Sequence, residues 1–428
     1  MSKLFREHVL TGHGDTPLDS LLEQLWRAPV ASGDVRIVAN PRRSKAWHDE
    51  EQYWILPSLA KPRMLIPRGN RKVTAASLLA YRRLRPKKVS IGRGGLGWMA
   101  RSGLPLSRDT LSVQSRAGLA TKAPLPLAEI SSSLGSEQLS AAIGIRLGDN
   151  RKATLQLFDH GGRPSGYAKI AWDAASRDYV DTERDVLSAV AGGSASMRVP
   201  ALAGEGVWDG YPYLVSTPLP EDVRAVRGRV GAPTPQELFS LCAVHRFGTV
   251  ADSAHFKALG WRLGELVDTT GENLGEAARR LESLLRMRNS SVPIAERWHG
   301  DMVPWNMARE SSGTLWCWDW ETSEPDAVAG LDAWHWAVSV RRESQGSFSQ
   351  EDWSAAGRQI QPYLQAAAIP RSAWDDIAGV YALVVAERAW SLAAARGDWS
   401  SSWLTPANLV GLLNRVAGEL SEPGTPAP

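Results

Sequence analysis

Residues 298–306 read WHGDMVPWN and contain the pattern H-G-D-x-x-x-x-N. Four fixed residue types at this spacing occur by chance in a chain of this length with a probability of roughly 0.003, if residue types are equally frequent. Phosphoryl transfer needs a carboxylate that holds and deprotonates the acceptor hydroxyl, and an amide oxygen that can ligate magnesium. The short loop from Asp301 to Asn306 can aim both groups at one small volume. The pattern therefore predicts a phosphotransferase site with Asp301 as the base and Asn306 as a metal ligand.

A second acidic position follows this stretch. Residues 315–321 read LWCWDWE, an apolar run that ends in acids. Because Gly313 supplies a turn, residues 307–318 are predicted to form a hairpin that returns Asp319 beside the first loop. A carboxylate there would be a second ligand for the magnesium that bridges the phosphates of ATP.

Taken together, H-G-D-x-x-x-x-N, D-W-E at 319–321 and G-x-D at 330–332 resemble the aminoglycoside phosphotransferase and choline-kinase-like branch of the protein-kinase-like fold. The resemblance covers roughly residues 138–420. It implies a bilobal α+β fold, in which a small antiparallel-sheet lobe precedes a larger helical lobe and ATP lies between the two. It also implies ATP and Mg²⁺ as cofactors and a hydroxylated small molecule as the acceptor: a sugar, an aminoglycoside or a related metabolite.

The resemblance assigns a role to each matched residue. Asp301 corresponds to the catalytic base, and His299 to the histidine of the catalytic loop. Asn306 and Asp319 correspond to the magnesium ligands, which hold the nucleotide through the metal. Asp332 corresponds to the acid that braces the catalytic loop. The helix that follows Asp332 reads Ala-Trp-His-Trp, which departs from the Leu-Ala usual in the family.

The preceding part of the chain contains a candidate ion pair for the ATP phosphates. Lys169 lies in the middle of a predicted strand between apolar neighbours, where it needs a counter-ion or a phosphate. Glu183 shares a helix face with Val180 and Leu187, and a glutamate on an apolar face is costly unless it is paired. We therefore predict a Lys169–Glu183 pair, although an edge-strand lysine and an ordinary surface acid remain the alternatives. The loop 148–152 lies where a phosphate-covering loop is expected.

Charge is distributed unevenly along the chain. Residues 1–130 contain 22 basic and 10 acidic residues, a net charge of +12, whereas the remainder contains 27 and 36, a net charge of −9. This asymmetry indicates units with different surfaces. A stretch rich in Ser, Pro, Leu and Ala, residues 104–137, is predicted to be a linker. The predicted organisation is a basic N-terminal region with linker at 1–130, an ATP-binding N-lobe at 131–220, a catalytic and acceptor-binding C-lobe at 221–420 and a disordered tail at 421–428.

Other classes of protein fit the composition less well. The two cysteines, Cys242 and Cys317, lie far apart and in no C-x-x-C pattern, which argues against a disulfide framework or a cysteine zinc site. We find no unbroken apolar stretch long enough for a bilayer and no apolar segment at the start that would mark a signal peptide. These features predict a cytoplasmic protein without a transmembrane segment, and no nucleic-acid partner is expected.

Two competing hypotheses and two misleading motifs remain. The protein could be a catalytically weak, kinase-like nucleotide-binding scaffold whose basic residues 61–101 dock on a membrane or an anionic partner. A protein kinase is disfavoured because H-G-D replaces H-R-D, D-W-E replaces D-F-G, and an A-P-E segment is missing.

A second H-G-D at 13–15 lacks the asparagine. The G-x-G-x-x-G at 92–97 lies too far before Lys169 to be a kinase glycine loop.

Overall fold

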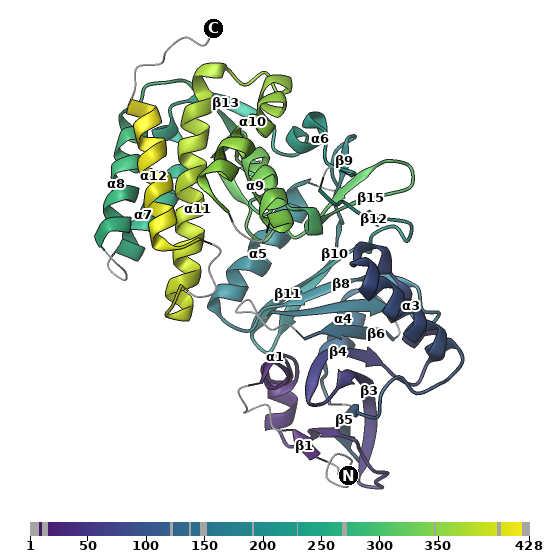
Figure 1. Ribbon diagram of the computed structural model, residues 1–428. Helices are drawn as coiled ribbons and strands as arrows, with labels where there is room; N and C mark the ends of the chain where they lie inside the picture. The colour runs from purple at the N-terminus through teal and green to yellow at the C-terminus, as the bar shows by residue number, and fades with distance from the viewer. Residues whose placement is uncertain are drawn as a thin grey trace. The chain divides into compact units, whose positions relative to one another are not determined.

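The computed structural model describes residues 8–10, 16–119, 123–136, 138–145, 152–190, 192–228, 230–267, 272–345, 348–399 and 404–421. Three expectations fall outside these residues: most of the loop 148–152, the H-G-D at 13–15 and the tail from 422 onward. The chain divides into two compact units (Figure 1). We call them the sheet unit, Met1–Gly192 with Val199–Arg224, and the helical unit, Gly193–Arg198 with Ala225–Pro428.

The sheet unit is organised around one ten-stranded antiparallel sheet. The strand order is β1-β2-β5-β3-β4-β6-β7-β8-β11-β10. Leu65 pairs with Ile143 and so joins β4 to β6. The strands of the basic N-terminal region therefore belong to the same sheet as β8, the strand that carries Lys169. The strands are β1 His8–Leu10, β2 Val35–Ala39, β3 Trp47–Ser58, β4 Lys61–Pro67, β5 Thr110–Arg116, β6 Ser140–Gly144, β7 Ala153–Phe158, β8 Pro164–Ile170, β10 Leu202–Trp208 and β11 Tyr211–Ser216.

Helices cover both faces of this sheet. Ile55 and Leu65 pack into a core with α1 and α4, whereas their neighbours Leu56 and Ile66 pack into a second core with α2 and α3. Adjacent residues of a strand point to opposite faces, so a sheet buried on both faces needs unbroken apolar runs such as WIL and MLI. The helices are α1 Pro17–Ala31, α2 Arg71–Leu79, η1 Arg82–Leu84, α3 Lys87–Arg101, α4 Pro126–Ser133 and α5 Ala174–Val190.

The expected linker at 104–137 is wrong, because it contains β5 and α4. Strand β5 lies between β2 and β3, and its polar residues Ser112, Gln114 and Ser115 are buried. Ser112 Oγ and Gln114 Nε2 donate hydrogen bonds to Asp49 Oδ1 on β3, at 2.5 and 2.7 Å. Buried polar side chains are tolerated when they are paired. Composition alone cannot show pairing with a residue some sixty positions away.

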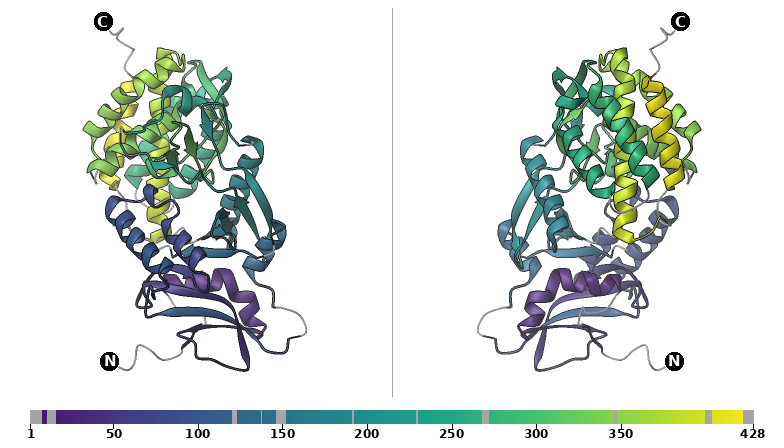
Figure 2. Two further views of the ribbon diagram at one scale, coloured as in Figure 1. Left: turned by 90° about the vertical axis from the view of Figure 1, so that its right-hand side faces the viewer. Right: turned by 90° about the vertical axis from the view of Figure 1, so that its left-hand side faces the viewer.

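The helical unit combines two small sheets with long helices (Figure 2). One sheet has the order β12-β15-β16-β9 and the other β13-β14-β17. The strands are β9 Met197–Arg198, β12 Arg224–Ala225, β13 Val244–Gly248, β14 Val292–Trp298, β15 Met307–Arg309, β16 Leu315–Cys317 and β17 Glu324–Val328. The helices are α6 Pro235–Phe239, η2 Val250–Asp252, α7 Ala254–Val267, α8 Glu272–Met287, η3 Pro304–Asn306, α9 Leu331–Gln345, α10 Gln350–Ala366, η4 Arg371–Ala373, α11 Trp374–Arg396 and α12 Pro406–Ser421.

Helix α11 runs through the core of the helical unit. Val380, Leu383 and Ala386 are buried in one cluster with α8, α9 and α12. Among the described residues, one segment, Arg371–Arg396, is long and apolar enough to meet the criteria for a membrane span, and 67% of its apolar window is buried inside the protein. A core helix passes the same test, so this finding is weak evidence for a membrane span.

The α+β class predicted from the sequence is confirmed, with an antiparallel sheet in one unit and mainly helices in the other. The glycine-rich residues 92–97 lie inside helix α3. They form neither a dinucleotide turn nor a phosphate loop. A Cβ at Gly97 would lie 2.6 Å from Leu79 Cδ2, so this glycine permits the close approach of α3 to α2.

Candidate active site

The H-G-D loop follows β14 and is fixed by an acid at the start of α9. Asp332 Oδ2 accepts the His299 backbone N–H at 2.8 Å, and Asp332 Oδ1 accepts the Gly300 N–H at 3.1 Å. Asp332 is only 3% exposed, so these two bonds satisfy a buried carboxylate. Gly300 has φ +83°, and a Cβ there would lie 2.3 Å from the carbonyl oxygen of Thr322. The turn therefore requires glycine at this position.

The buried ring of His299 forms hydrogen bonds with the backbone of the loop and with the backbone of Trp318. The Asp301 backbone N–H donates to Nδ1 at 3.1 Å, so Nε2 carries the proton and donates to the carbonyl oxygen of Trp318 at 3.2 Å. Burial lowers the pKa of His299, which keeps the ring neutral. Since the ring is fully buried and both nitrogens are engaged, we assign His299 to positioning rather than to proton transfer.

Asp301 is held from two sides. Asn306 Nδ2 donates to Asp301 Oδ2 at 2.8 Å, and His335 Nε2 lies 3.2 Å from Asp301 Oδ1. Burial alone would raise the pKa of Asp301, but the hydrogen bond and charge of His335, with the charge of Arg388, lower it below its usual value. The Asp301 side chain is 36% exposed. It is therefore an ionised, oriented carboxylate that a substrate can reach.

The hairpin of β15 and β16 brings Asp319 back to this loop. The Trp318 backbone N–H donates to the carbonyl oxygen of Asn306 at 3.1 Å, and the Trp318 carbonyl accepts from His299. Asp319 comes next, with φ +71°, a left-handed conformation that is uncommon outside glycine. One carboxylate oxygen of Asp319 and one of Glu321 lie within 4.8 Å of each other. The turn thus places the first acid of D-W-E beside the H-G-D loop.

The oxygen donors of this loop suit a hard divalent cation. Because Asn306 Nδ2 makes both amide hydrogen bonds, to Asp301 Oδ2 and to the Asp301 carbonyl, its Oδ1 is the remaining polar end. Among the described residues, we find no donor to this oxygen. An amide oxygen and a carboxylate are the ligand types that Mg²⁺ takes. The residues present therefore fit the metal that the resemblance implies.

In the sheet unit, Lys169 on β8 and Glu183 on α5 form a buried ion pair between Nζ and Oε2. Their side chains are 10% and 4% exposed. Ala168 and Ile170 point into the core with α1, so Lys169 faces the opposite side of the sheet, where Glu183 of α5 meets it. The pairing that the sequence suggested is therefore present in the structure, whereas its role in holding phosphates is a proposal.

Three residues of this site were not found from the sequence. His335 lies on α9, one turn beyond Asp332, and its Nδ1 lies 3.1 Å from the hydroxyl of Tyr381 on α11. Arg388, two turns further along α11, donates from Nη1 to the Gly300 carbonyl at 2.5 Å. The unusual Ala-Trp-His-Trp after Asp332 was the available signal for His335. No local sequence pattern marks Tyr381 or Arg388, because only tertiary packing brings α11 to the loop.

Comparisons with known proteins were made on both sequence and structure. No family model and no curated protein matches the sequence. Solved structures similar to this chain include small-molecule kinases and phosphotransferases.

Three of these structures illustrate the likeness. A protein assigned as a fructosamine-3-kinase from Haemophilus somnus has a TM-score of 0.42 at 11% identity, over 69% of this chain and 96% of its own. Ethanolamine kinase from Plasmodium vivax has a TM-score of 0.43 at 12% identity, over 65% and 82%. An ADP-bound aminoglycoside phosphotransferase has a TM-score of 0.38 at 12% identity, over 68% and 95%. Values this low support no inference about the substrate.

Proposed function

We propose that this protein is an ATP-dependent phosphotransferase that moves the γ-phosphate to a hydroxyl of a small molecule: a sugar, an aminoglycoside or a related metabolite. The observation that carries the proposal is the Asp301 carboxylate, which is ionised, reachable and held by Asn306 on one oxygen and His335 on the other. A carboxylate held in this way is suited to orienting an acceptor hydroxyl. A cytoplasmic location, where ATP is plentiful, belongs to the same proposal.

In the proposed reaction, Asp301 accepts the proton of the acceptor hydroxyl while the hydroxyl oxygen attacks the γ-phosphorus. The bond from that phosphorus to the β,γ-bridging oxygen breaks, and ADP leaves with the electron pair. Asp301 then passes the proton to solvent. When magnesium is bound, it neutralises charge on the phosphate oxygens, and Asn306 and Asp319 would hold it. Asp332 and His299 keep the loop in the conformation that aims Asp301.

The sheet unit contributes Lys169 to this proposal. A lysine paired with a buried glutamate is held in one position and keeps its charge in a low-dielectric setting. Its ammonium group can then hold the α- and β-phosphates of ATP, with Glu183 fixing the direction of the side chain. Lys169 binds the nucleotide in this scheme and takes no part in proton transfer.

The proposal is tested by ADP release from purified protein with Mg-ATP and a panel of hydroxylated metabolites. We expect turnover with at least one acceptor, and a loss of about 100-fold or more in Asp301→Ala and Asp319→Ala. The matched control is Asp375→Ala, an exposed acid in the first turn of α11. Wild-type turnover in both site variants refutes the assignment. Thermal stabilisation by Mg-ATP without turnover on any acceptor favours a nucleotide-binding scaffold instead.

A further inference from the structure

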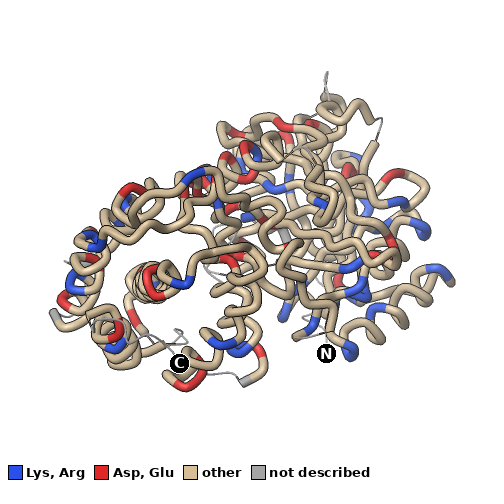
Figure 3. Tube along the Cα trace, turned by 90° about the horizontal axis from the view of Figure 1, so that it is seen from above, with Lys and Arg blue, Asp and Glu red and all other residues tan. Residues whose placement is uncertain are grey.

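One segment of the sheet unit has an extreme charge bias. Residues 52–108 contain 13 Lys and Arg residues and no Asp or Glu. The segment forms β4, α2, η1 and α3, and the basic positions of the chain are marked blue in Figure 3. A soluble domain of ordinary composition mixes acids and bases on its surface. An acid-free segment of this length favours an anionic partner.

Helix α3 exposes large apolar side chains within this segment. Its buried side consists of Arg93, Gly97 and Ala100, which pack towards α2. The opposite side carries Ile91 and Trp98, which are 74% and 67% exposed. Seven positions apart, these two residues lie on one face of the helix. Exposed apolar groups gathered on one helix face mark an interaction surface.

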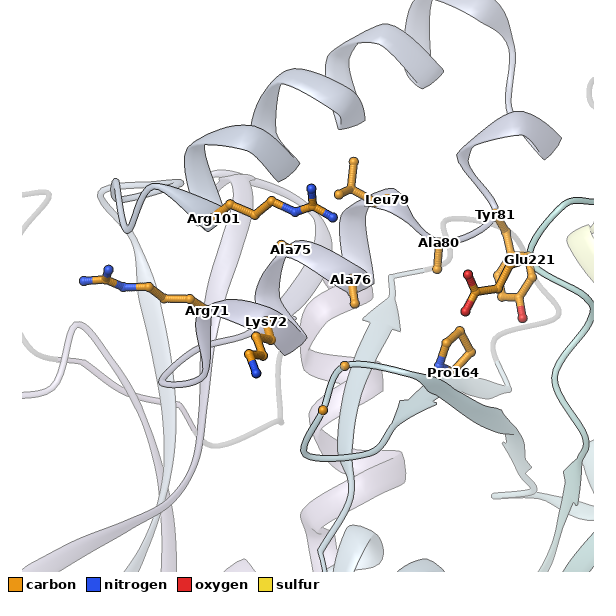
Figure 4. A pocket seen from close by; sticks show the side chains of 12 residues that line it. Arg71, Lys72, Ala75, Ala76, Leu79, Ala80, Tyr81, Arg101, Pro164 and Glu221 are labelled. Carbon is orange, nitrogen blue, oxygen red and sulfur yellow. The ribbon is translucent and has the colours of Figure 1, made fainter.

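Cations flank these two residues. Lys87 and Lys88 lie in the first turn of α3, and Arg101 is its last residue. Arg101 also lines a cavity of about 410 Å³ together with Arg71 and Lys72 of α2 (Figure 4). Glu221 also lines this cavity, but within the described part of the chain no hydrogen bond or ion pair joins a carboxylate or carbonyl to the side chains of Arg71, Lys72 or Arg101. Their charges therefore remain available to an external anion.

We propose that α3 docks this protein on the surface of an anionic phospholipid membrane. Ile91 and Trp98 enter the interface between headgroups and acyl chains, while Lys87, Lys88 and Arg101 bind lipid phosphates. This combination of an apolar stripe with flanking cations is that of a helix lying in the plane of a membrane.

Other occupants fit the face less well. A second copy of the chain would bring two strongly basic segments together, and like charges repel. Nucleic acid would satisfy the cations, but it offers nothing to the exposed alkyl groups of Ile91 and Leu104, which are 74% and 48% exposed. A lipid surface accommodates both the cations and the alkyl groups.

The test is flotation of the full-length chain with vesicles of phosphatidylcholine alone or mixed with phosphatidylglycerol. We expect binding to the mixed vesicles only. The double variant Ile91→Ser/Trp98→Ser should lower binding by about tenfold or more. Lys87→Gln/Lys88→Gln should lower it by about fivefold for each charge removed. Because all four side chains are exposed, these variants should keep the thermal stability of the wild type.

Helix α7 provides matched controls in the helical unit. Trp261 on this helix is 68% exposed, and Lys257 is also exposed. Trp261→Ser and Lys257→Gln should bind vesicles like the wild type. Equal binding to both kinds of vesicle, or unchanged binding of the α3 variants, overturns the proposal. Gel-shift binding of duplex DNA that depends on α3 and is tighter than vesicle binding overturns it in favour of a nucleic-acid surface. Vesicle binding needs no turnover, so this test is independent of the phosphotransferase proposal.

Discussion

The contact between His335 and Asp301 can be removed by a single substitution on α9. His335 Nε2 lies 3.2 Å from Asp301 Oδ1, and the hydroxyl of Tyr381 lies 3.1 Å from His335 Nδ1. A carboxylate at neutral pH can only accept, so His335 Nε2 donates to Asp301 Oδ1, and the other ring nitrogen lies within hydrogen-bond distance of the tyrosine hydroxyl. The variant His335→Leu removes both hydrogen bonds and leaves Oδ1 of the base without its protein partner.

The expected size of the effect follows from this geometry. A hydrogen bond to a charged group contributes about 1.5–3 kcal/mol, which corresponds to about 10- to 100-fold in rate if it is needed in the transition state. Asn306 still holds Oδ2 in the variant, so the carboxylate can rotate but cannot leave the loop. Misplacement of a reacting group by about 1 Å costs about 100-fold. We therefore expect kcat to fall about 10- to 100-fold, with KM for ATP nearly unchanged.

The assay is steady-state ADP release, with two further variants as controls. Gln at position 335 can place an amide N–H near the position of Nε2, so His335→Gln should recover part of the activity that His335→Leu loses. Tyr381→Phe removes only the outer hydrogen bond and should have the smallest effect. Wild-type kcat in His335→Leu would refute the idea that this contact orients the base. So would an equal loss in the Leu and Gln variants, since that would indicate a role in packing alone.

Three other variants test the site and its support. Gly300→Ala should reduce both activity and melting temperature in circular dichroism, because φ +83° costs a Cβ-bearing residue about 1–2 kcal/mol and the Thr322 carbonyl lies 2.3 Å from the new Cβ. Lys169→Met should raise KM for ATP in the kinetic assay and destabilise the fold, because Glu183 would lose its buried partner; Lys169→Met/Glu183→Gln should regain stability but not ATP affinity. Burial and two nearby arginines lower the pKa of His255 to about 3 in the folded protein, whereas in the unfolded chain it is near 6.5. As the pH falls, His255 is therefore protonated in the unfolded chain before it is protonated in the folded protein. The free energy of unfolding, measured by urea denaturation, should therefore fall by about 2 kcal/mol between pH 7 and pH 5. This fall should be absent in His255→Phe.

The loop that holds the candidate base could be predicted from the sequence because its residues are local. Asp301 and Asn306 lie five positions apart, and the hairpin that returns Asp319 needs only a turn and two short strands. Short-range patterns of this kind depend on turn chemistry and spacing, which the sequence displays directly. The roles of these residues remain predictions until the variants are measured.

The rest of the site depends on contacts that no local pattern shows. Tyr381 and Arg388 lie 80 or more positions after Asp301, on a helix whose sequence is apolar on almost every side. A buried helix of this kind has no distinct polar face from which a functional residue could be predicted. In the same way, the polar composition of β5 suggested a loop, because its partners on β3 lie about sixty positions away.

Helix α9 both supports the H-G-D loop and contacts the side chain of Asp301. Asp332 and His335 lie three positions apart and so share one face of the helix. The first accepts the backbone N–H groups of the loop, and the second contacts the carboxylate that the loop presents. Behind them, Trp334 stacks on Trp353 with ring centroids 4.5 Å apart, and Trp353 stacks on Tyr381 at 6.0 Å. Close-packed aromatic rings resist sliding of one helix past another. The position of Asp301 therefore depends on how α9, α10 and α11 pack, and core substitutions in these helices should affect turnover before they unfold the protein.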